Sequence, residues 1–279
     1  MARDLTLGQY YPVESFVHKL DPRIKFIIMT VYIVGVFLVK HIYGFAVVAA
    51  FAILSTLISR VPILSVLKSL KGIIFIVIFT AVLNVFFHTE GKVYFTIGKL
   101  LITEGGVFFA LKMALRLILL VLGTTLLTYT TTPMALTDGL ERLMTPLTWI
   151  KIPVHDIAII MSISLRFIPI LMEEVQKIMK AQRARGAEFD RGGLVKRAKA
   201  LLPILIPLFI SAFRRADELA LALDARCYNA TPNRTRYKKL KMHYRDFIAF
   251  LAGAAYIVLI VAVNNKFWIP TLTYSFPFI

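Results

Sequence analysis

The stretch VFFALKMALRLILLVLGTTLLTY, Val107–Tyr129, decides the class of fold. Its charged residues are Lys112 and Arg116, and the rest of its 23 residues are almost all apolar. A helix needs about 20 mostly apolar residues to cross a bilayer. We therefore expect an all-α membrane protein with Val107–Tyr129 as one of its spans.

Four further apolar stretches lie at about 24–39, 43–59, 72–88 and 247–263. Several are shorter than a typical span, so flanking residues must complete them. We expect five transmembrane helices, with the longest extending to about 107–130. Asn84 lies within the third helix, where we expect it to hydrogen-bond to a neighbouring helix rather than to hold a substrate.

The composition supports a membrane protein over a soluble one. The chain has 279 residues, of which 58% are hydrophobic, whereas soluble domains average about 45–50%. The net charge of +17 would suggest nucleic acid in a soluble protein. However, no basic stripe alternates with stacking aromatic residues, so we expect no nucleic-acid partner. The charge instead indicates loops rich in Lys and Arg on the cytoplasmic side.

The distribution of Lys and Arg predicts the orientation in the membrane. With five spans and a cytoplasmic N-terminus, the inner segments 1–25, 60–71 and 132–245 hold 27 of these residues and the outer segments hold four. Positive loops stay inside. We expect a multi-pass protein of the cell membrane with its N-terminus in the cytoplasm and its C-terminus outside.

Three regions follow from this topology. Residues 1–131 form an N-terminal membrane region, 132–245 a cytoplasmic-face region, and 246–279 a last span with an outer tail. The middle region has apolar runs at 157–171 and 201–213, and the second is too short, and too kinked by Pro203 and Pro207, to span. It is predicted to form long helices at the cytoplasmic face, separated by the glycines of DRGGL (Asp190–Leu194).

Motifs for catalysis or metal binding are missing from the sequence. The histidines are scattered, no phosphate-binding P-loop or GxSxG elbow occurs, and Cys227 is the one cysteine. We expect no catalytic residue, no metal site and no cofactor in this chain. Lys112 and Arg116 share a helix face; we favour charges that reach the outer interface over an ion relay, because the span has no carboxylates.

Two segments carry an arginine near the end of a predicted helix. These arginine tips are Ala184–Arg185–Gly186, within KAQRARGAEF, and Ala225–Arg226–Cys227, within ALDARCYNA. An arginine fork can pair with a carboxylate or with backbone carbonyls, and small flanking residues leave it free to enter a groove. A solvated or lipid-bound charge is the simpler interpretation, and spacing alone leaves both open.

The order of several motifs resembles the transmembrane T component of energy-coupling factor (ECF) transporters, over about Ser15–Val263. The similar stretches are SFVHKLDPRIKF (Ser15–Phe26), TTPMALTDGLERLMTPL (Thr131–Leu147), SLRFIPILMEEVQKIMKAQRARGAEF (Ser164–Phe189), ALDARCYNA (Ala222–Ala230) and NRTRYKKLK (Asn233–Lys241).

The resemblance implies a non-catalytic scaffold of a vitamin importer. Arg185 and Arg226 would then end coupling helices and dock on two cytoplasmic ABC ATPases, which bind the Mg-ATP. A membrane-embedded S subunit, one of several that exchange, would bind the substrate and pack on the same helices. We expect its surface to include the following residues of the second coupling helix: Pro203, Leu205, Pro207 and Phe209. Cys227 departs from the usual glycine, which leaves the geometry of the second tip open.

Three alternatives remain at this stage. The chain could be a T component dedicated to biotin or to cobalt and nickel. It could instead be a self-contained secondary transporter or channel, which would need polar groups or broken helices at mid-membrane. A membrane enzyme would need a paired-carboxylate or metal site, and the sequence offers neither.

Overall fold

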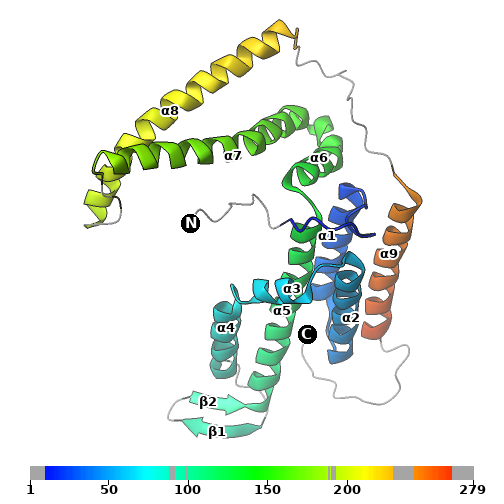
Figure 1. The fold of residues 1–279 in the computed structure, drawn as a ribbon. Helices are drawn as coiled ribbons and strands as arrows, with labels where there is room; N and C mark the ends of the chain where they lie inside the picture. The colour runs from blue at the N-terminus through cyan, green and yellow to red at the C-terminus, as the bar shows by residue number, and fades with distance from the viewer. Residues whose placement is uncertain are drawn as a thin grey trace. The chain divides into compact units, whose positions relative to one another are not determined.

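A computed structural model describes residues 10–87, 92–97, 100–187, 189, 193–228 and 242–265. The segment Asn233–Lys241 and the predicted outer tail from residue 266 lie outside these residues, as do three residues of DRGGL. The elements are α1 (Pro22–Leu38), α2 (Ile42–Ser59), α3 (Ile63–Leu70), α4 (Ile74–Phe87), β1 (Val93–Ile97), β2 (Leu100–Thr103), α5 (Glu104–Thr130), α6 (Pro133–Met144), the 3-10 helix η1 (Thr145–Ile150), α7 (Val154–Ala184), α8 (Leu194–Ala225) and α9 (Tyr244–Asn264) (Figure 1).

The chain divides into two compact units. The bundle unit comprises Gly8–Leu143 and Leu240–Ile279, and the α7–α8 unit comprises Met1–Leu7 and Met144–Lys239. The helical architecture confirms the predicted fold class, with the small β1–β2 hairpin as its one addition among the described residues.

The structure confirms a multi-pass membrane protein. Among the described residues, α2, α5, α7 and α9 are long and apolar enough to cross a bilayer. A fifth span results if α3 and α4 are counted together, although they meet with a bend of 52°.

Two helices differ from the expected set of spans. Helix α1 has 17 residues, at the lower limit of length for a span. Helix α7 does meet the length and composition of a span, although the sequence placed it at the cytoplasmic face. The reason is that α7 continues through Pro169 for 31 residues, so its apolar part is longer than the run at 157–171.

Local structure adds three details to the pattern of spans. The basic segment around Pro62 forms α3, with Pro62 at its N-cap. The connection before α5 contains β1 and β2, whose strands pair antiparallel. Asn84 does not bridge two helices through its amide nitrogen, which donates instead to the carbonyl of Thr80 in the same helix at 2.8 Å.

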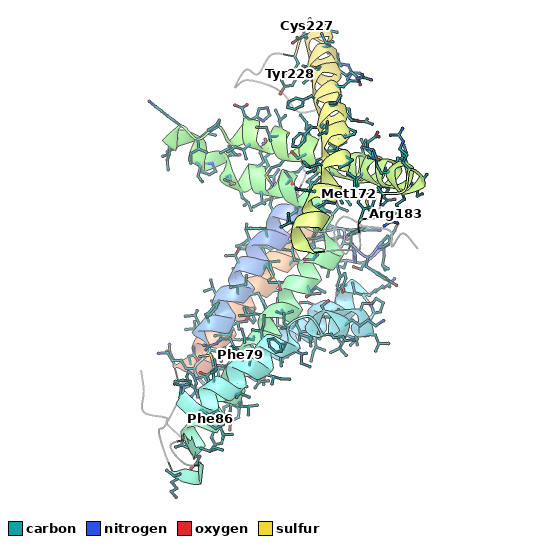
Figure 2. All side chains as sticks on the ribbon, turned by 90° about the vertical axis from the view of Figure 1, so that its left-hand side faces the viewer. Phe79, Phe86, Met172, Arg183, Cys227 and Tyr228 are labelled. Atoms are coloured by element: carbon teal, nitrogen blue, oxygen red, sulfur yellow. The ribbon has the colours of Figure 1, made fainter. Side chains whose placement is uncertain are left out.

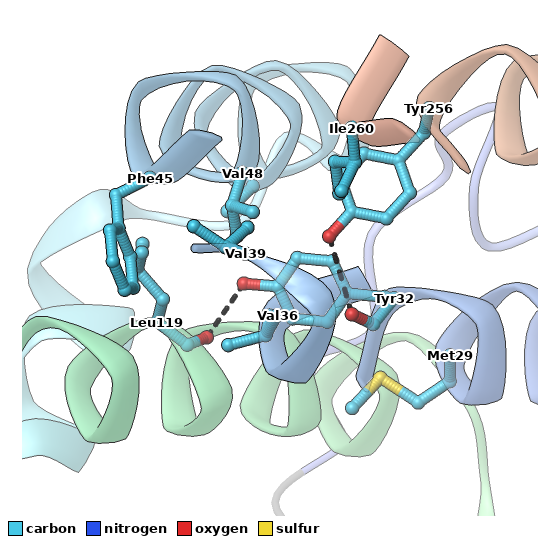
Figure 3. Packing of buried hydrophobic residues seen from close by; sticks show 10 residues of the cluster. Met29, Tyr32, Val36, Val39, Phe45, Val48, Leu119, Tyr256 and Ile260 are labelled. Carbon is cyan, nitrogen blue, oxygen red and sulfur yellow. Dashed lines mark hydrogen bonds between the residues drawn. The ribbon is translucent and has the colours of Figure 1, made fainter. Parts of the chain in front are cut away.

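The core of the bundle unit lies where α1 meets α2, α5 and α9 (Figure 3). Tyr32 of α1 is its centre: its hydroxyl donates to the carbonyl of Leu119 in α5 at 2.7 Å. Tyr256 of α9 in turn donates to the carbonyl of Tyr32 at 3.2 Å. Each buried hydroxyl therefore has an acceptor, which removes the cost of leaving it unpaired in an apolar core.

Glycines make room for these two tyrosine rings. A Cβ added at Gly123 of α5 would overlap the ring of Tyr32, and one at Gly35 of α1 would overlap that of Tyr256. The helices therefore approach closely because these positions lack side chains, as is common between membrane helices.

The far end of α1 is fixed by its two neighbours. Asn264 of α9 donates to the carbonyl of Leu38 at 2.6 Å, and Arg116 of α5 donates to that of Val39 at 3.2 Å. These carbonyls would otherwise lack an intrahelical partner. Arg116 thus acts as a cap at the end of α1.

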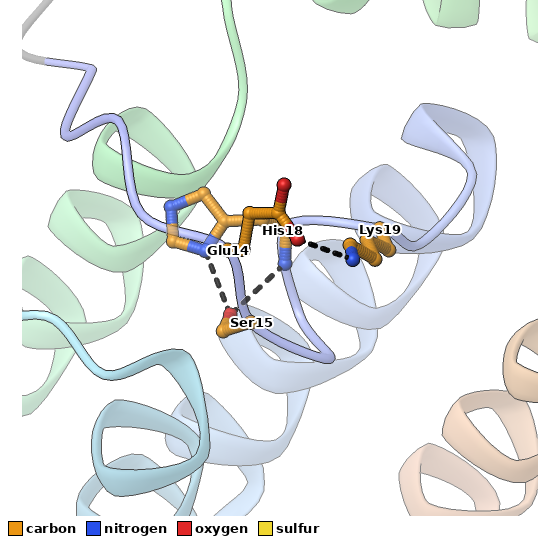
Figure 4. Close-up of polar contacts among 4 residues, drawn as sticks. All are labelled: Glu14, Ser15, His18 and Lys19. Atoms are coloured by element: carbon orange, nitrogen blue, oxygen red, sulfur yellow. Dashed lines mark hydrogen bonds and ion pairs between the residues drawn. The ribbon is translucent and has the colours of Figure 1, made fainter.

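The loop before α1 is ordered by His18 (Figure 4). Its Nδ1 lies 2.7 Å from the hydroxyl of Ser15, and its Nε2 lies 3.0 Å from the carbonyl of Tyr11. A neutral ring with its proton on Nε2 satisfies both bonds. Burial lowers the pKa of His18 below 6.5, against an opposing contribution from the bond to Tyr11.

Candidate functional site

The first arginine tip ends α7 in a left-handed turn. Arg185 is the C-cap, and the next residue, Gly186, has φ of 86°. The N–H of Gly186 donates to the carbonyl of Arg183 at 3.0 Å, and that of Ala187 donates to Gln182 at 3.0 Å. These two bonds define a Schellman motif, in which glycine normally supplies the positive φ.

The second tip has the same backbone structure without glycine. Arg226 caps α8, and Cys227 takes the left-handed position with φ of 50° (Figure 2). Its N–H donates to Asp224 at 2.9 Å, and that of Tyr228 donates to Leu223 at 3.0 Å. The geometry left open at Cys227 is therefore that of the first tip, and the cysteine bears the strain of the left-handed conformation.

Both arginine side chains are exposed. Arg185 has φ of −87° and ψ of 8°, and Arg226 has φ of −92° and ψ of 10°, so the two caps differ by only a few degrees. Ala184 and Ala225, which precede them, are exposed as well. Neither guanidinium is paired with another described residue, so each can meet an acceptor outside this chain.

Helices α7 and α8 run antiparallel. Arg215 of α8 donates to Glu174 of α7 at 3.5 Å, and the amide of Gln182 donates to the carbonyl of Pro203, also at 3.5 Å. That carbonyl has no partner in its own helix, because Pro207, four residues on, has no N–H. Gln182 thus joins the helices at the place where proline interrupts α8.

The antiparallel pairing sets the two tips far apart. Pro203 lies beside Gln182, three residues before Arg185, whereas Arg226 follows Pro203 by 23 residues. At a rise of about 1.5 Å per residue, the tips lie on the order of 35 Å apart. They cannot enter one small groove together.

The predicted apolar surface of α8 is exposed in this chain. Pro203, Leu205, Pro207 and Phe209 are all exposed, and Ile204 between them is buried. Sequence reasoning missed further exposed residues of the same helix, and their spacing of three and four could have identified them: Leu202, Ile206, Ile210 and Phe213. A continuous apolar stripe therefore runs along the middle of α8, larger than the predicted set.

No group of three or more His, Cys, Asp or Glu side chains suited to a metal ion occurs within the part of the chain that the structure describes. Cys227 is exposed.

Comparison with known proteins identifies the family. Residues 13–237 match the CbiQ family model, described as cobalt transport protein. A relative from Clostridium kluyveri, an energy-coupling factor transporter transmembrane protein EcfT, is 48% identical over 96% of this chain and 99% of its own length. Proteins of the same name from Ruminiclostridium cellulolyticum and Bacillus subtilis are 46% and 48% identical over 96% and 88% of the chain, respectively.

These relatives are aligned over nearly their whole length, and their shared name refers to energy coupling rather than to one substrate. The apolar helices agree with a membrane subunit. The chain therefore belongs to the EcfT family and is the transmembrane T component of an energy-coupling factor transporter.

Proposed function

We propose that this T component is a non-catalytic scaffold, which links two cytoplasmic ATPases to a membrane-embedded S subunit that binds a vitamin. One observation carries the proposal: two helix ends of the same geometry, each with an exposed arginine, lie at opposite ends of an antiparallel pair. Two similar arginine tips that lie far apart can each contact one of two similar ATPase subunits. The Mg-ATP binds to those partners, and this chain holds no cofactor.

Each arginine docks by pairing with carboxylates in a groove of one ATPase. The guanidinium can form two parallel hydrogen bonds to a carboxylate, and such charged pairs contribute most when they are withdrawn from water. The preceding alanines, Ala184 and Ala225, leave the fork accessible. The Schellman turns fix the direction in which the chain leaves each helix, so that the arginine lies at the very end of its helix.

The S subunit packs on the apolar stripe of α8. Phe209 is 60% exposed and Phe213 is 68% exposed, which is too much apolar surface to leave in water. The stripe offers shape rather than specific polar contacts, and such surfaces accept more than one partner.

The α7–α8 unit lies at the cytoplasmic face, with the chain's N-terminus inside and its C-terminus outside. The excess of Lys and Arg in the inner segments supports this orientation. Although α7 is apolar enough to span, its antiparallel partner α8 is not among the candidate spans. We therefore assign 132–245 to the cytoplasmic face, and 1–131 and 246–279 to the membrane.

Arginine substitutions in the complete complex test the docking. Arg185→Ala and Arg226→Ala each remove one charged pair, at a cost of about 2 kcal/mol or more in docking. The double variant should lose the ATPases during purification and should lose ATP-dependent uptake. Arg214→Ala, an exposed arginine on the body of α8, is the matched control and should change neither. Normal assembly and uptake by the double variant would contradict the proposal.

The single cysteine provides a second test without any substitution. Cys227 lies in the second tip and is exposed. A membrane-impermeant maleimide should label it in inside-out vesicles but not in right-side-out ones. Bound ATPases should slow the labelling. Labelling from the outside would refute the proposed orientation.

A further inference from the structure

Two covalent connections between the units adjoin segments of the bundle unit that contact the start of α1, and a third, after Leu7, lies outside the described residues. The first boundary follows Leu143, at the end of α6, and the second precedes Leu240, shortly before α9 begins at Tyr244. Movement of the α7–α8 unit that is passed along these two connections reaches the bundle unit at α6 or at the start of α9. The contacts of these two places therefore decide how much of that movement is passed on.

The start of α9 is tied to α1 by Asp246. This residue is 3% exposed. One carboxylate oxygen accepts from the N–H of Asp21 at 2.8 Å, and the other accepts from the N–H of His243, the N-cap of α9, also at 2.8 Å. Asp246 thus caps its own helix and at the same time holds the residue that precedes α1. The two aspartates are 225 positions apart in sequence.

Helix α6 lies against the same turn of α1. A Cβ added at Gly139 would lie 2.9 Å from the Cβ of Pro22 and 3.2 Å from its carbonyl carbon. The backbone of α6 therefore contacts the first residue of α1 directly, with no side chain between them. Asp21 accepts from the N–H of Arg23 at 2.9 Å, which orders this turn.

Lys25 fixes the end of α5, from which α6 departs. Its ammonium donates to the carbonyl of Thr130, the last residue of α5, at 2.8 Å, and to that of His18 at 3.1 Å. The side chain is buried, and the carboxylates of Asp21 and Asp246 attract its charge. Buried charges are costly to desolvate, so such a cluster is weak evidence for added stability. What it does provide is a fixed geometry.

We infer that this junction, formed by Asp21, Pro22, Lys25, Gly139 and Asp246, is the fixed point that passes movement of the α7–α8 unit to the bundle unit. The inference rests on the proposed function. These are positioning residues, because they belong to the bundle unit, whereas both arginine tips belong to the α7–α8 unit. A close-packed junction transmits displacement, whereas a loose one absorbs it.

The test uses the complete complex of T component, S subunit and ATPases in liposomes. Asp246→Ala removes the link to Asp21, and Gly139→Ala forces α6 away from Pro22. Both variants should assemble and hydrolyse ATP within about twofold of the unaltered complex, but the amount of vitamin transported per ATP should fall about tenfold. Asp246→Glu should restore part of the coupling.

Two matched controls should leave transport per ATP unchanged. Ile248→Ala alters an exposed side chain near the start of α9, and Gly72→Ala adds a Cβ that meets one backbone oxygen at an ordinary 3.6 Å. If uptake and hydrolysis fall together, or if transport per ATP stays normal, the inference is overturned. If the Asp246→Ala protein does not accumulate in cells, transport per ATP of the Gly139→Ala complex tests the inference. Absence of ATP-driven uptake by the unaltered complex would instead refute the proposed function.

Discussion

The bundle unit and the α7–α8 unit are both helical, but only the bundle unit buries a core of its own. The bundle core includes Tyr32 and Tyr256, with their hydroxyls paired. In the described part of the α7–α8 unit, the buried apolar side chains are Val154, Ala158 and Ile204. A pair of helices with so little burial gains little stability from its own contacts. The bundle unit thus has internal packing that stabilises it, whereas α7 and α8 depend more on contacts with lipid or other subunits.

The largest expected effect is a substitution at the close contact in the bundle core. Gly123→Ala places a methyl group against the ring of Tyr32, and such overpacking costs about 3 kcal/mol. Thermal unfolding of the purified chain in detergent should show a clear decrease in midpoint. Gly193→Ala, before α8, adds a Cβ with nothing within 4 Å and should leave the midpoint unchanged. If the two substitutions lowered the midpoint equally, the proposed difference in packing between the two units would be wrong.

A smaller effect on stability is expected at the two arginine tips, where a substitution changes only the local backbone conformation. Cys227→Gly should stabilise the last turn of α8 by up to about 1 kcal/mol, because the left-handed conformation strains a residue with a Cβ. Gly186→Ala should weaken the last turn of α7 by a similar amount. Hydrogen exchange of the backbone amides at positions 186 and 227 would measure both changes. Slower exchange after Gly186→Ala would contradict the assignment.

The smallest effect concerns pH and the loop before α1. Because the pKa of His18 is lowered in the folded state, protonation favours the unfolded chain. Stability is therefore full above pH 6.5 and should fall as the pH drops below it. His18→Gln should flatten this slope in thermal unfolding between pH 7 and about 5.5.

Glu14 provides the control for this slope. Its exposed ion pair with Lys19, at 2.7 Å, lowers its pKa from 4.5, so it titrates below the pH range in question. Glu14→Gln should leave the slope intact. A slope that survives His18→Gln would show that other groups control it.

The sequence predicted the apolar helices well, because a long run such as Val107–Tyr129 carries its own signal. It predicted α3 poorly, since eight residues after Pro62 are too few to show a helical period. It also ended the apolar part of α7 too early, because Pro169 and the charges that follow resemble a boundary.

The candidate site also contains features that the sequence predicted and features that it did not. Arg185 and Arg226 were found through local motifs and a resemblance, and their docking remains a prediction. The left-handed Cys227 could not be foreseen, because a residue with a Cβ rarely adopts that conformation. Neither could the bond from Lys25 to Thr130, since hydrogen bonds between residues 105 positions apart leave no pattern in a single sequence.

The matching caps on α7 and α8 have a consequence for symmetry. Two antiparallel helices of 31 and 32 residues, ended by the same backbone turn, are approximately exchanged by a half-turn rotation about an axis between them. Such a rotation usually relates two copies of a protein in a dimer. Here one polypeptide contains both halves. A single chain of this kind can face a two-fold symmetric pair of partners without being duplicated itself.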